Sequence, residues 1–97
     1  MVQTICSHLL SVGEKKIVLE KPNTLRRIFF SVRVVAGEAA WRETLLSFDD
    51  PLFHTYYSLN GSRKYLEATG ADIFQGNIWA WNKSDVGLVF TATEILH

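Results

Sequence analysis

The sequence predicts an all-β protein, a single antiparallel β-sandwich of about eight short strands. Three observations support this fold class. Apolar and polar residues alternate with a period of two in several segments. Turn residues recur at intervals of roughly 8–12 residues. β-Branched and aromatic residues, which pleated sheets favour, fill the segments between the turns. A chain of 97 residues is long enough for one hydrophobic core, so we expect one domain over residues 1–97.

The clearest strand pattern lies in residues 26–34. One parity holds four apolar residues, which are Ile28, Phe30, Val32 and Val34. The other parity holds Arg27, Phe29, Ser31 and Arg33. Successive side chains of a strand point to opposite faces. We therefore expect the first set to face the core and the second set to face solvent or a partner.

The C-terminal segment 87–95 repeats this alternation. Leu88, Phe90 and Ala92 share one face, and Thr91 and Thr93 share the other. The pattern predicts a last strand with one buried face.

Turn signals separate the predicted strands. Asn60-Gly61 is the strongest hairpin signal, because both residues tolerate the positive φ of a type I′ turn. Asp50-Pro51 suits the start of a type I turn. Gly76 lies within an apolar segment and predicts a bulge or bend.

Residues 38–46 leave two interpretations open. The segment is rich in good helix formers, and a helix of two turns would fit it. We favour a strand, which places Trp41, Glu43 and Leu45 on one face. The opposite face then holds Arg42, Thr44 and Leu46.

Composition excludes several function classes. Lys plus Arg is 10 and Asp plus Glu is 10, so the formal charge is +0 and a dedicated nucleic-acid binder is not expected. Cys6 is the single cysteine, so no internal disulfide can form. No apolar run approaches the roughly 20 residues that a membrane span needs. The N-terminus does not resemble a signal peptide.

The sequence nominates no catalytic residue, metal site or cofactor. Asp49, Asp50 and His54 are close in sequence, but carboxylates before a proline are ordinary turn residues. The other histidines, His8 and His97, are scattered and lack the spacing that a cupin-type metalloenzyme would need. No Gly-x-Ser-x-Gly motif or glycine-rich phosphate loop occurs. We therefore expect a protein that is not an enzyme.

Two Asn-x-Ser sequons coincide with predicted turns. They begin at Asn60 and Asn82. Asn and Ser are favoured in turns in any case. We interpret both sequons as turn chemistry and not as glycosylation sites.

Trp79 and Trp81 share a parity, opposite to Ile78 and Ala80. If the indoles face inward, they fill the core and each N–H finds an acceptor. If Ile78 and Ala80 face inward, the two indoles stand on an outer face, as an interface or a stacking platform. We favour the inward orientation, because large exposed aromatic patches are uncommon on monomers.

Several further residues suggest a face that a partner covers. Phe29 shares its strand face with Arg27 and Arg33, and one of the adjacent Tyr56 and Tyr57 must point outward. The candidate interface residues are Phe29, Arg27, Arg33, Tyr57, Trp79 and Trp81. These residues do not identify the partner. Residues 1–12 precede the first clear turn and could serve as an N-terminal arm that becomes ordered on a partner.

Residues 70–84, followed by 88–96, resemble the closing hairpin of small β-sandwich proteins on the particles of tailed bacteriophages. The shared features are a glycine-containing bend, a strand ending in Asn-x-Ser and a last strand closing on Glu-Ile. The resemblance implies a jelly-roll-like virion protein, assembled in the host cytoplasm as a dimer or trimer, whose partners are the major capsid protein or other virion proteins. Such a protein would cement or decorate the capsid by bridging neighbouring major capsid subunits. The alternative is a tail or fibre component, or a module that binds carbohydrate or a receptor. No site residue can be transferred from this resemblance.

Overall fold

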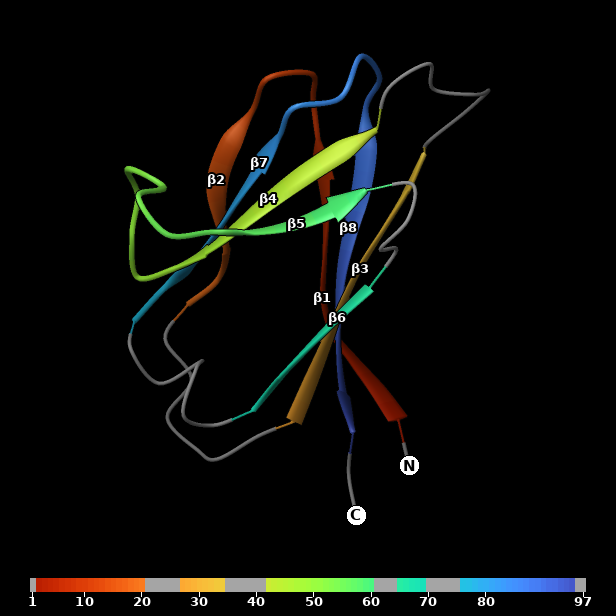
Figure 1. Cartoon of the computed structure of the whole chain (residues 1–97). Helices are drawn as coiled ribbons and strands as arrows, with labels where there is room; N and C mark the ends of the chain where they lie inside the picture. Colours follow the sequence, from red (N-terminus) through yellow and green to blue (C-terminus); the bar gives the residue numbers. More distant parts are fainter. Residues whose placement is uncertain (1, 21–26, 35–41, 61–64, 70–75, 96–97) are drawn as a thin grey trace.

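The structure is a computed structural model that describes residues 2–20, 27–34, 42–60, 65–69 and 76–95. These residues form eight β-strands (Figure 1). In chain order the strands are β1 (Val2–Leu10), β2 (Lys15–Leu19), β3 (Arg27–Val34), β4 (Glu43–Phe48), β5 (Tyr57–Asn60), β6 (Tyr65–Thr69), β7 (Ile78–Asn82) and β8 (Leu88–Ile95). The described residues contain no helix that could span a membrane.

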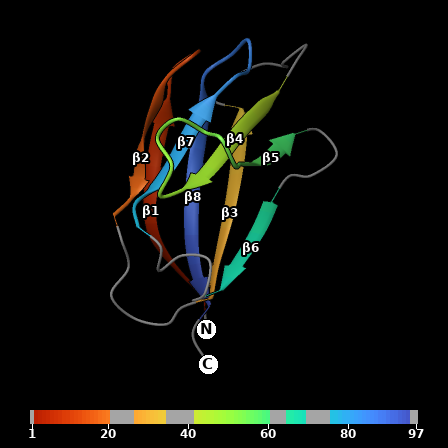
Figure 2. The same cartoon turned by 60° about the vertical axis from the view of Figure 1, so that its left-hand side comes forward.

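The strands form two four-stranded sheets packed face to face (Figures 1 and 2). Sheet A has the order β1-β8-β3-β6, and sheet B has the order β2-β7-β4-β5. Every neighbouring pair is antiparallel. The chain crosses between the sheets at most connections, and this strand order is that of a jelly roll. The predicted all-β sandwich is confirmed.

The alternating segments place their apolar sets as predicted. Ile28 and Phe30 of β3 are fully buried between the sheets, and so are Leu88, Phe90 and Ala92 of β8. The Phe30 and Phe90 rings stack with their centroids 5.7 Å apart. Burial of these side chains is the main favourable term for the sandwich, at roughly 25 cal/mol per Å² of apolar surface.

The described part of the ambiguous segment 38–46 is a strand. Thr44 and Leu46 of β4 point inward and are fully buried. Glu43 and Leu45 belong to the opposite face, as the strand interpretation predicted. Trp41 lies outside the described residues.

The predicted hairpin at Asn60-Gly61 is wrong. β5 pairs with β4 in sheet B, and β6 pairs with β3 in sheet A, so the two strands belong to different sheets. Turn chemistry favours a reversal at Asn60-Gly61, but it does not decide which strands pair afterwards. Pairing follows the long-range burial of whole strand faces, here Leu59 against the core from sheet B.

Most of the segment expected to form an arm belongs to the sandwich. Residues 2–10 form β1, which pairs with β8 over the whole strand. Leu10 is fully buried in the core cluster. Residues 11 and 12 follow in the turn to β2.

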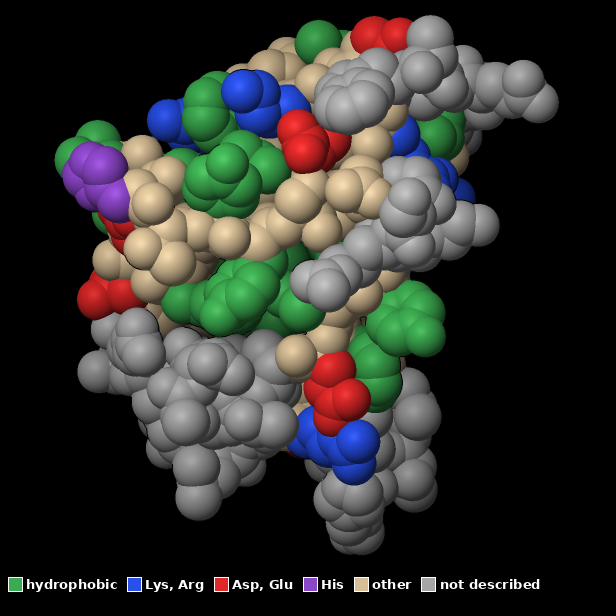
Figure 3. All heavy atoms as spheres, in the orientation of Figure 1, with side chains coloured by type: hydrophobic (Ala, Val, Ile, Leu, Met, Phe, Trp, Pro, Cys, Tyr) green, Lys and Arg blue, Asp and Glu red, His purple; other side chains and the backbone are tan. Residues whose placement is uncertain are grey.

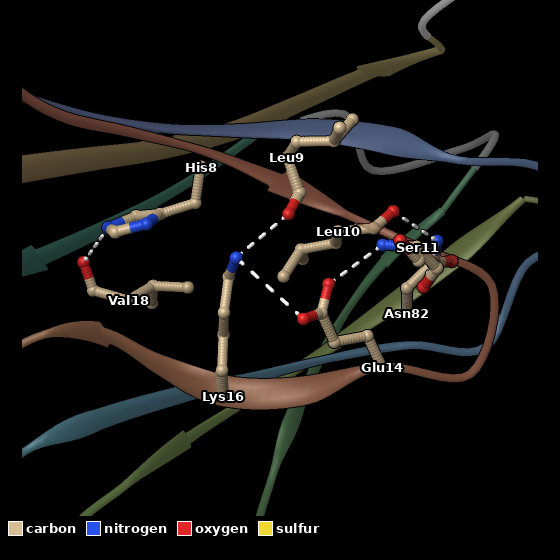
Figure 4. Close-up of polar contacts among 8 residues, drawn as sticks. All are labelled: His8, Leu9, Leu10, Ser11, Glu14, Lys16, Val18 and Asn82. Carbon is tan, nitrogen blue, oxygen red and sulfur yellow. Dashed lines mark hydrogen bonds and ion pairs between the residues drawn. The ribbon is translucent and has the colours of Figure 1, made fainter.

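Side chains of β1 and β2 connect the two sheets at one edge of the sandwich (Figure 4). β2 has a register irregularity between Ile17 and Leu19, so Val18 has no partner on β7. His8 donates from Nε2 to the Val18 carbonyl at 2.8 Å. Lys16 donates from Nζ to the Leu9 carbonyl, also at 2.8 Å. These bonds satisfy backbone oxygens of two edge strands.

A fully buried amide, that of Asn82, joins the turns at one end of the sandwich (Figure 4). Its Nδ2 donates to the carbonyls of Leu10, Ser11 and Val86 at 2.9–3.2 Å. Its Oδ1 accepts from the Ser84 N–H at 2.8 Å. The backbone N–H of Asn82 donates to the Glu14 carbonyl. Asn82 therefore has a structural role in the turn, in agreement with our interpretation of this sequon.

Ser84, the third residue of that sequon, ties the same end to β4. Its Oγ accepts from the Glu43 N–H at 2.7 Å and donates to the Glu43 carbonyl at 3.0 Å. The Lys83 N–H also donates to the Glu43 carbonyl. The β7–β8 turn thus positions the start of β4.

Gly76 forms the expected bend before β7. Its φ is +157° and it is buried. A Cβ atom on residue 76 would overlap the Asp49 side chain. The Asp49 N–H donates to the Asn77 carbonyl at 2.8 Å, so the two segments are held in this close approach.

Asn82→Ala should lower the free energy of unfolding by about 2–4 kcal/mol, because several buried backbone groups lose their partners at once. Asn82→Asp should also destabilise, since a carboxylate cannot donate to three carbonyls. Urea unfolding measures both. Gln3→Ala, at an exposed position, is the matched control. Equal midpoints for N82A and Q3A would contradict this account.

Thr44→Val should stabilise the protein by about 1 kcal/mol. The Thr44 hydroxyl is buried and has no hydrogen-bond partner among the described residues. Valine keeps the shape of the side chain and removes the polar group. Thermal unfolding measures the effect, with Thr55→Val at an exposed position as the control. A lower midpoint for T44V than for wild type would show that the hydroxyl has a partner in solution.

Candidate functional site

The sandwich separates the six candidate interface residues into three places. Arg27, Phe29 and Arg33 of β3 lie on the outer face of sheet A, opposite in parity to the buried Ile28 and Phe30. Trp79 and Trp81 of β7 lie on the outer face of sheet B. Tyr57 begins β5, an edge strand of sheet B. The six residues therefore do not form one surface.

The favoured inward orientation of the two indoles is wrong. Ile78 and Ala80 occupy the inward positions of β7 and are fully buried, while Trp79 and Trp81 are half-buried on the outside. The buried cluster already contains the large rings of Phe30 and Phe90. Because these rings take up much of the volume of the close-packed core, the inward positions of the facing strand accept a small side chain.

The residues between β4 and β5 explain why outward indoles are tolerated. We call residues 49–56 the strap. Leu45 and Ser47 point outward from β4, since they pair with Trp81 and Trp79, yet they are 6% and 0% exposed. The strap folds back over this face and covers them, and in Figure 2 it lies in front of β7 and β4.

Phe53 is the contact between the strap and the sheet. Its ring packs edge-on against Trp81, with centroids 5.6 Å apart, and it is 6% exposed. Lys15 places its ammonium 4.3 Å from the Trp81 ring centre and 5.4 Å from the Phe53 ring centre. Lys83 lies 4.5 Å from the same indole. Trp81 is thus occupied by groups of its own chain and is not a free stacking platform.

Asp50 organises the strap internally. Its carboxylate accepts from the backbone N–H groups of Leu52, His54 and Thr55 at 2.6–3.2 Å. Partial desolvation acts to raise the pKa of Asp50, but these hydrogen bonds outweigh it and lower the pKa below its ordinary value. The residue serves the turn, as the sequence predicted. The described residues contain no group of three or more His, Cys, Asp or Glu that could hold a metal ion.

Ser47 fastens the strap to β4. Its hydroxyl donates to the Asp50 carbonyl at 2.7 Å, and the Thr55 carbonyl lies 3.2 Å from the same oxygen. A fully buried hydroxyl between two carbonyls of the strap holds both of its ends near the sheet.

Sequence reasoning missed Phe53 and Lys15. Phe53 adopts a φ of +55°, which is uncommon for an aromatic residue and has no signal in the sequence. Lys15 meets Trp81 only because β2 pairs with β7, with Lys15 directly opposite Trp81. The one signal in the sequence is the apolar Leu52-Phe53 pair directly after Asp50-Pro51. A turn that is exposed to solvent needs no apolar residue, so this pair stands out.

The outer face of sheet A differs from that of sheet B. At the centre of this face, two rows of outward side chains run across β1, β8 and β3, and none of these side chains is charged. One row holds Ser7, Thr91 and Ser31, and the next row holds Thr4, Thr93 and Phe29. Phe29 packs edge-on against Tyr65 of β6 at 5.9 Å. Tyr65 and Leu9 are exposed at opposite margins of this face.

Charges on the outer face of sheet A stand at its ends and on the edge strand β6, where Glu67 lies opposite Phe29. Arg33 lies at one end, opposite Val89. Near the other end Arg27 is hydrogen-bonded to Glu67, and this contact lowers the pKa of the Glu67 carboxyl. Exposed pairs of this kind contribute little to stability. They leave the centre of the face free of charge.

Tyr57 links the core to the margin of the sandwich. Its ring meets Phe48 at 5.5 Å, and Phe48 meets the buried Phe30 at 6.1 Å. Tyr57 itself is 39% exposed. Figure 3 shows hydrophobic side chains reaching the surface on the side of the molecule where β5 lies.

Comparison with known proteins identifies the fold and no family. No family model matches the chain, and no curated protein matches it. Among solved structures, it is similar to the Cupin_2 domain of an XRE-family transcriptional regulator from Enterobacter cloacae, with a TM-score of 0.54 and 15% sequence identity. The match covers 100% of this chain and 96% of the other. The chain therefore has a cupin-like jelly-roll fold.

The resemblance to phage virion proteins is wrong. The similar solved structure is a domain of a transcriptional regulator and points away from capsid decoration and from the other phage roles. This chain shares only the generic β-sandwich with the phage proteins. The features that carried the resemblance were a bend at Gly76 and two closing strands, β7 and β8. A jelly roll of any function needs these elements, so they hold no information about a partner.

Acid should loosen the strap. The lowered pKa of Asp50 means that its contribution is fully present above the ordinary carboxyl pKa of about 4 and is lost as pH falls through the lower folded value. The groups that face it are the His54 imidazole, with Nδ1 3.7 Å from Oδ1, and the backbone N–H groups. NMR chemical shifts of the Phe53 and Trp81 rings during an acid titration measure the change. The same transition in Asp50→Asn would contradict the assignment.

Proposed function

We propose that this chain is a non-catalytic association domain that pairs with a second copy of itself through the outer face of sheet A. The observation that carries the proposal is the uncharged centre of this face, with the Phe29–Tyr65 ring pair beside it. A sheet with one solvated face alternates apolar residues inside with polar residues outside, and here the polar residues at the centre of the face carry no charge. Depletion of charge at the centre, with aromatic residues present and charges at the rim, is typical of an interface.

The contrast between the two sheets supports sheet A as the interface. The strap covers Leu45 and Ser47 on sheet B. On sheet A, Leu9 and Tyr65 are 58% and 64% exposed. A face that the described residues leave uncovered is a surface that gains from a partner.

A second copy fits this face in charge and in size. The chain has a formal charge of +0, so two copies do not repel each other. Four strands about 4.8 Å apart and about eight residues long span roughly 500 Å². A symmetric pair would bury about 1,000 Å² in total, which is near the lower limit of a specific interface. A dimer of moderate affinity follows from this area.

The interior of the described structure is mainly apolar. The cluster between the sheets consists of apolar side chains, among them Leu46, Leu59 and Ile78. The polar side chains buried in the described structure are Thr44, Ser47, Asn82 and Ser84. All but Thr44 hold backbone groups in place. The similar Cupin_2 domain belongs to a transcriptional regulator, so this fold does occur as one part of a regulatory protein.

Thr91→Lys should weaken the dimer by about 100-fold or more, because it buries an unpaired ammonium at the centre of the face. Thr91 lies on β8, between β1 and β3. Sedimentation equilibrium over a range of protein concentrations measures the dissociation constant. Far-UV circular dichroism checks that the variant is folded.

Thr55→Lys is the matched control, since it makes the same change at an exposed position on the strap. T55K should dimerise like the wild type. A wild-type protein that stays monomeric at high micromolar concentration would overturn the proposal. A T91K dimer of unchanged affinity would overturn the assignment to sheet A.

A further inference from the structure

The strap buries one of its eight residues. Phe53 is buried, while Leu52 and Tyr56 are 70% and 53% exposed. The other residues of the strap are exposed or half-buried. The apolar energy that holds the strap on sheet B therefore comes from a single side chain, which packs against Trp81.

The strap makes more hydrogen bonds within itself than to the sheet. Most of its hydrogen bonds are internal, because the Asp50 carboxylate accepts from three strap N–H groups and the Phe53 N–H donates to the Asp50 carbonyl. Two attachments reach outside it. These are the Ser47 hydroxyl and the bond from the Asp49 N–H to the Asn77 carbonyl. A segment that is bonded mainly to itself can open as one cooperative unit, with its internal hydrogen bonds breaking together while the strands stay folded.

Backbone strain also favours release. Asp49 and Phe53 are the two non-glycine residues with positive φ among those described, at +58° and +55°. Such conformations are costly for residues other than glycine and persist when surrounding contacts impose them. Loss of the Phe53–Trp81 contact would let both residues return to ordinary backbone conformations.

We propose that the strap is a hinged cover that opens as a unit, while the sandwich stays folded, and bares an apolar strip on sheet B formed by Leu45 and Trp81. The Asp49 end and the start of β5 at Tyr57 are the hinges. Lys15 contacts both Phe53 and Trp81 in the closed state and keeps only Trp81 in the open state. The cover acts on the face opposite to the proposed dimer interface, so neither proposal depends on the other.

Hydrogen exchange by NMR tests this proposal. The amides of Phe53, His54 and Thr55 should exchange together, and about 100-fold faster than those of Leu46 and Ala80 in β4 and β7. Phe53→Ala should accelerate the strap amides at least about 10-fold and leave the strand amides unchanged.

Two variants control the measurement. Phe53→Leu should restore most of the protection, because it returns apolar volume to the contact with Trp81. Leu52→Ala should have no effect, because Leu52 is the most exposed apolar residue of the strap. Strap amides that exchange at the rate of Leu46 and Ala80 would overturn the proposal. Equal acceleration of strap and strands in F53A, or of the strap in L52A, would do the same.

Discussion

The buried amide of Asn82 is the constraint on which the rest of the structure depends. No disulfide joins the two sheets, since Cys6 is the single cysteine, and the turns carry backbone groups that must be paired away from water. One side chain supplies donors to both the β1–β2 turn and the β7–β8 turn. Its Oδ1 fixes Ser84, which in turn holds the first residue of β4. Two turns and the start of β4 are therefore held together through one side chain.

This inward amide also sets the orientation of β7. With Asn82 inside, the period of two places Ala80 and Ile78 inside and both indoles outside. A one-residue shift of register would bury the indoles and expel Asn82 from its network. The outward Trp81 then requires a cover, which Phe53, Lys15 and Lys83 provide. The strap and its strained Phe53 are consequences of a polar contact on the other side of the same strand.

Local pattern predicted the elements, and long-range contacts decided their arrangement. The alternation in 26–34 and 87–95 identified the buried faces of β3 and β8, because side-chain direction in a strand depends only on parity. Asn60-Gly61 misled because a turn signal does not say which sheet the next strand joins. The indoles misled because hydrophobicity alone ranked Trp above Ala for the interior, while the available volume and the Asn82 bonds selected Ala80. The phage resemblance failed because it rested on elements common to the fold.

The two outer faces show how one fold can separate stability from association. On sheet B, outward apolar side chains are covered by a segment of the same chain, and this closure adds to the stability of the monomer. On sheet A, the outward hydroxyl and aromatic side chains are left uncovered by the described residues, and charges stand at the ends and on the edge strand β6. Threonine favours strands, and the hydroxyl groups of threonine and serine cost little to desolvate when a facing chain can accept their hydrogen bonds. A face of this composition tolerates water when alone and tolerates a partner when paired, which suits reversible association.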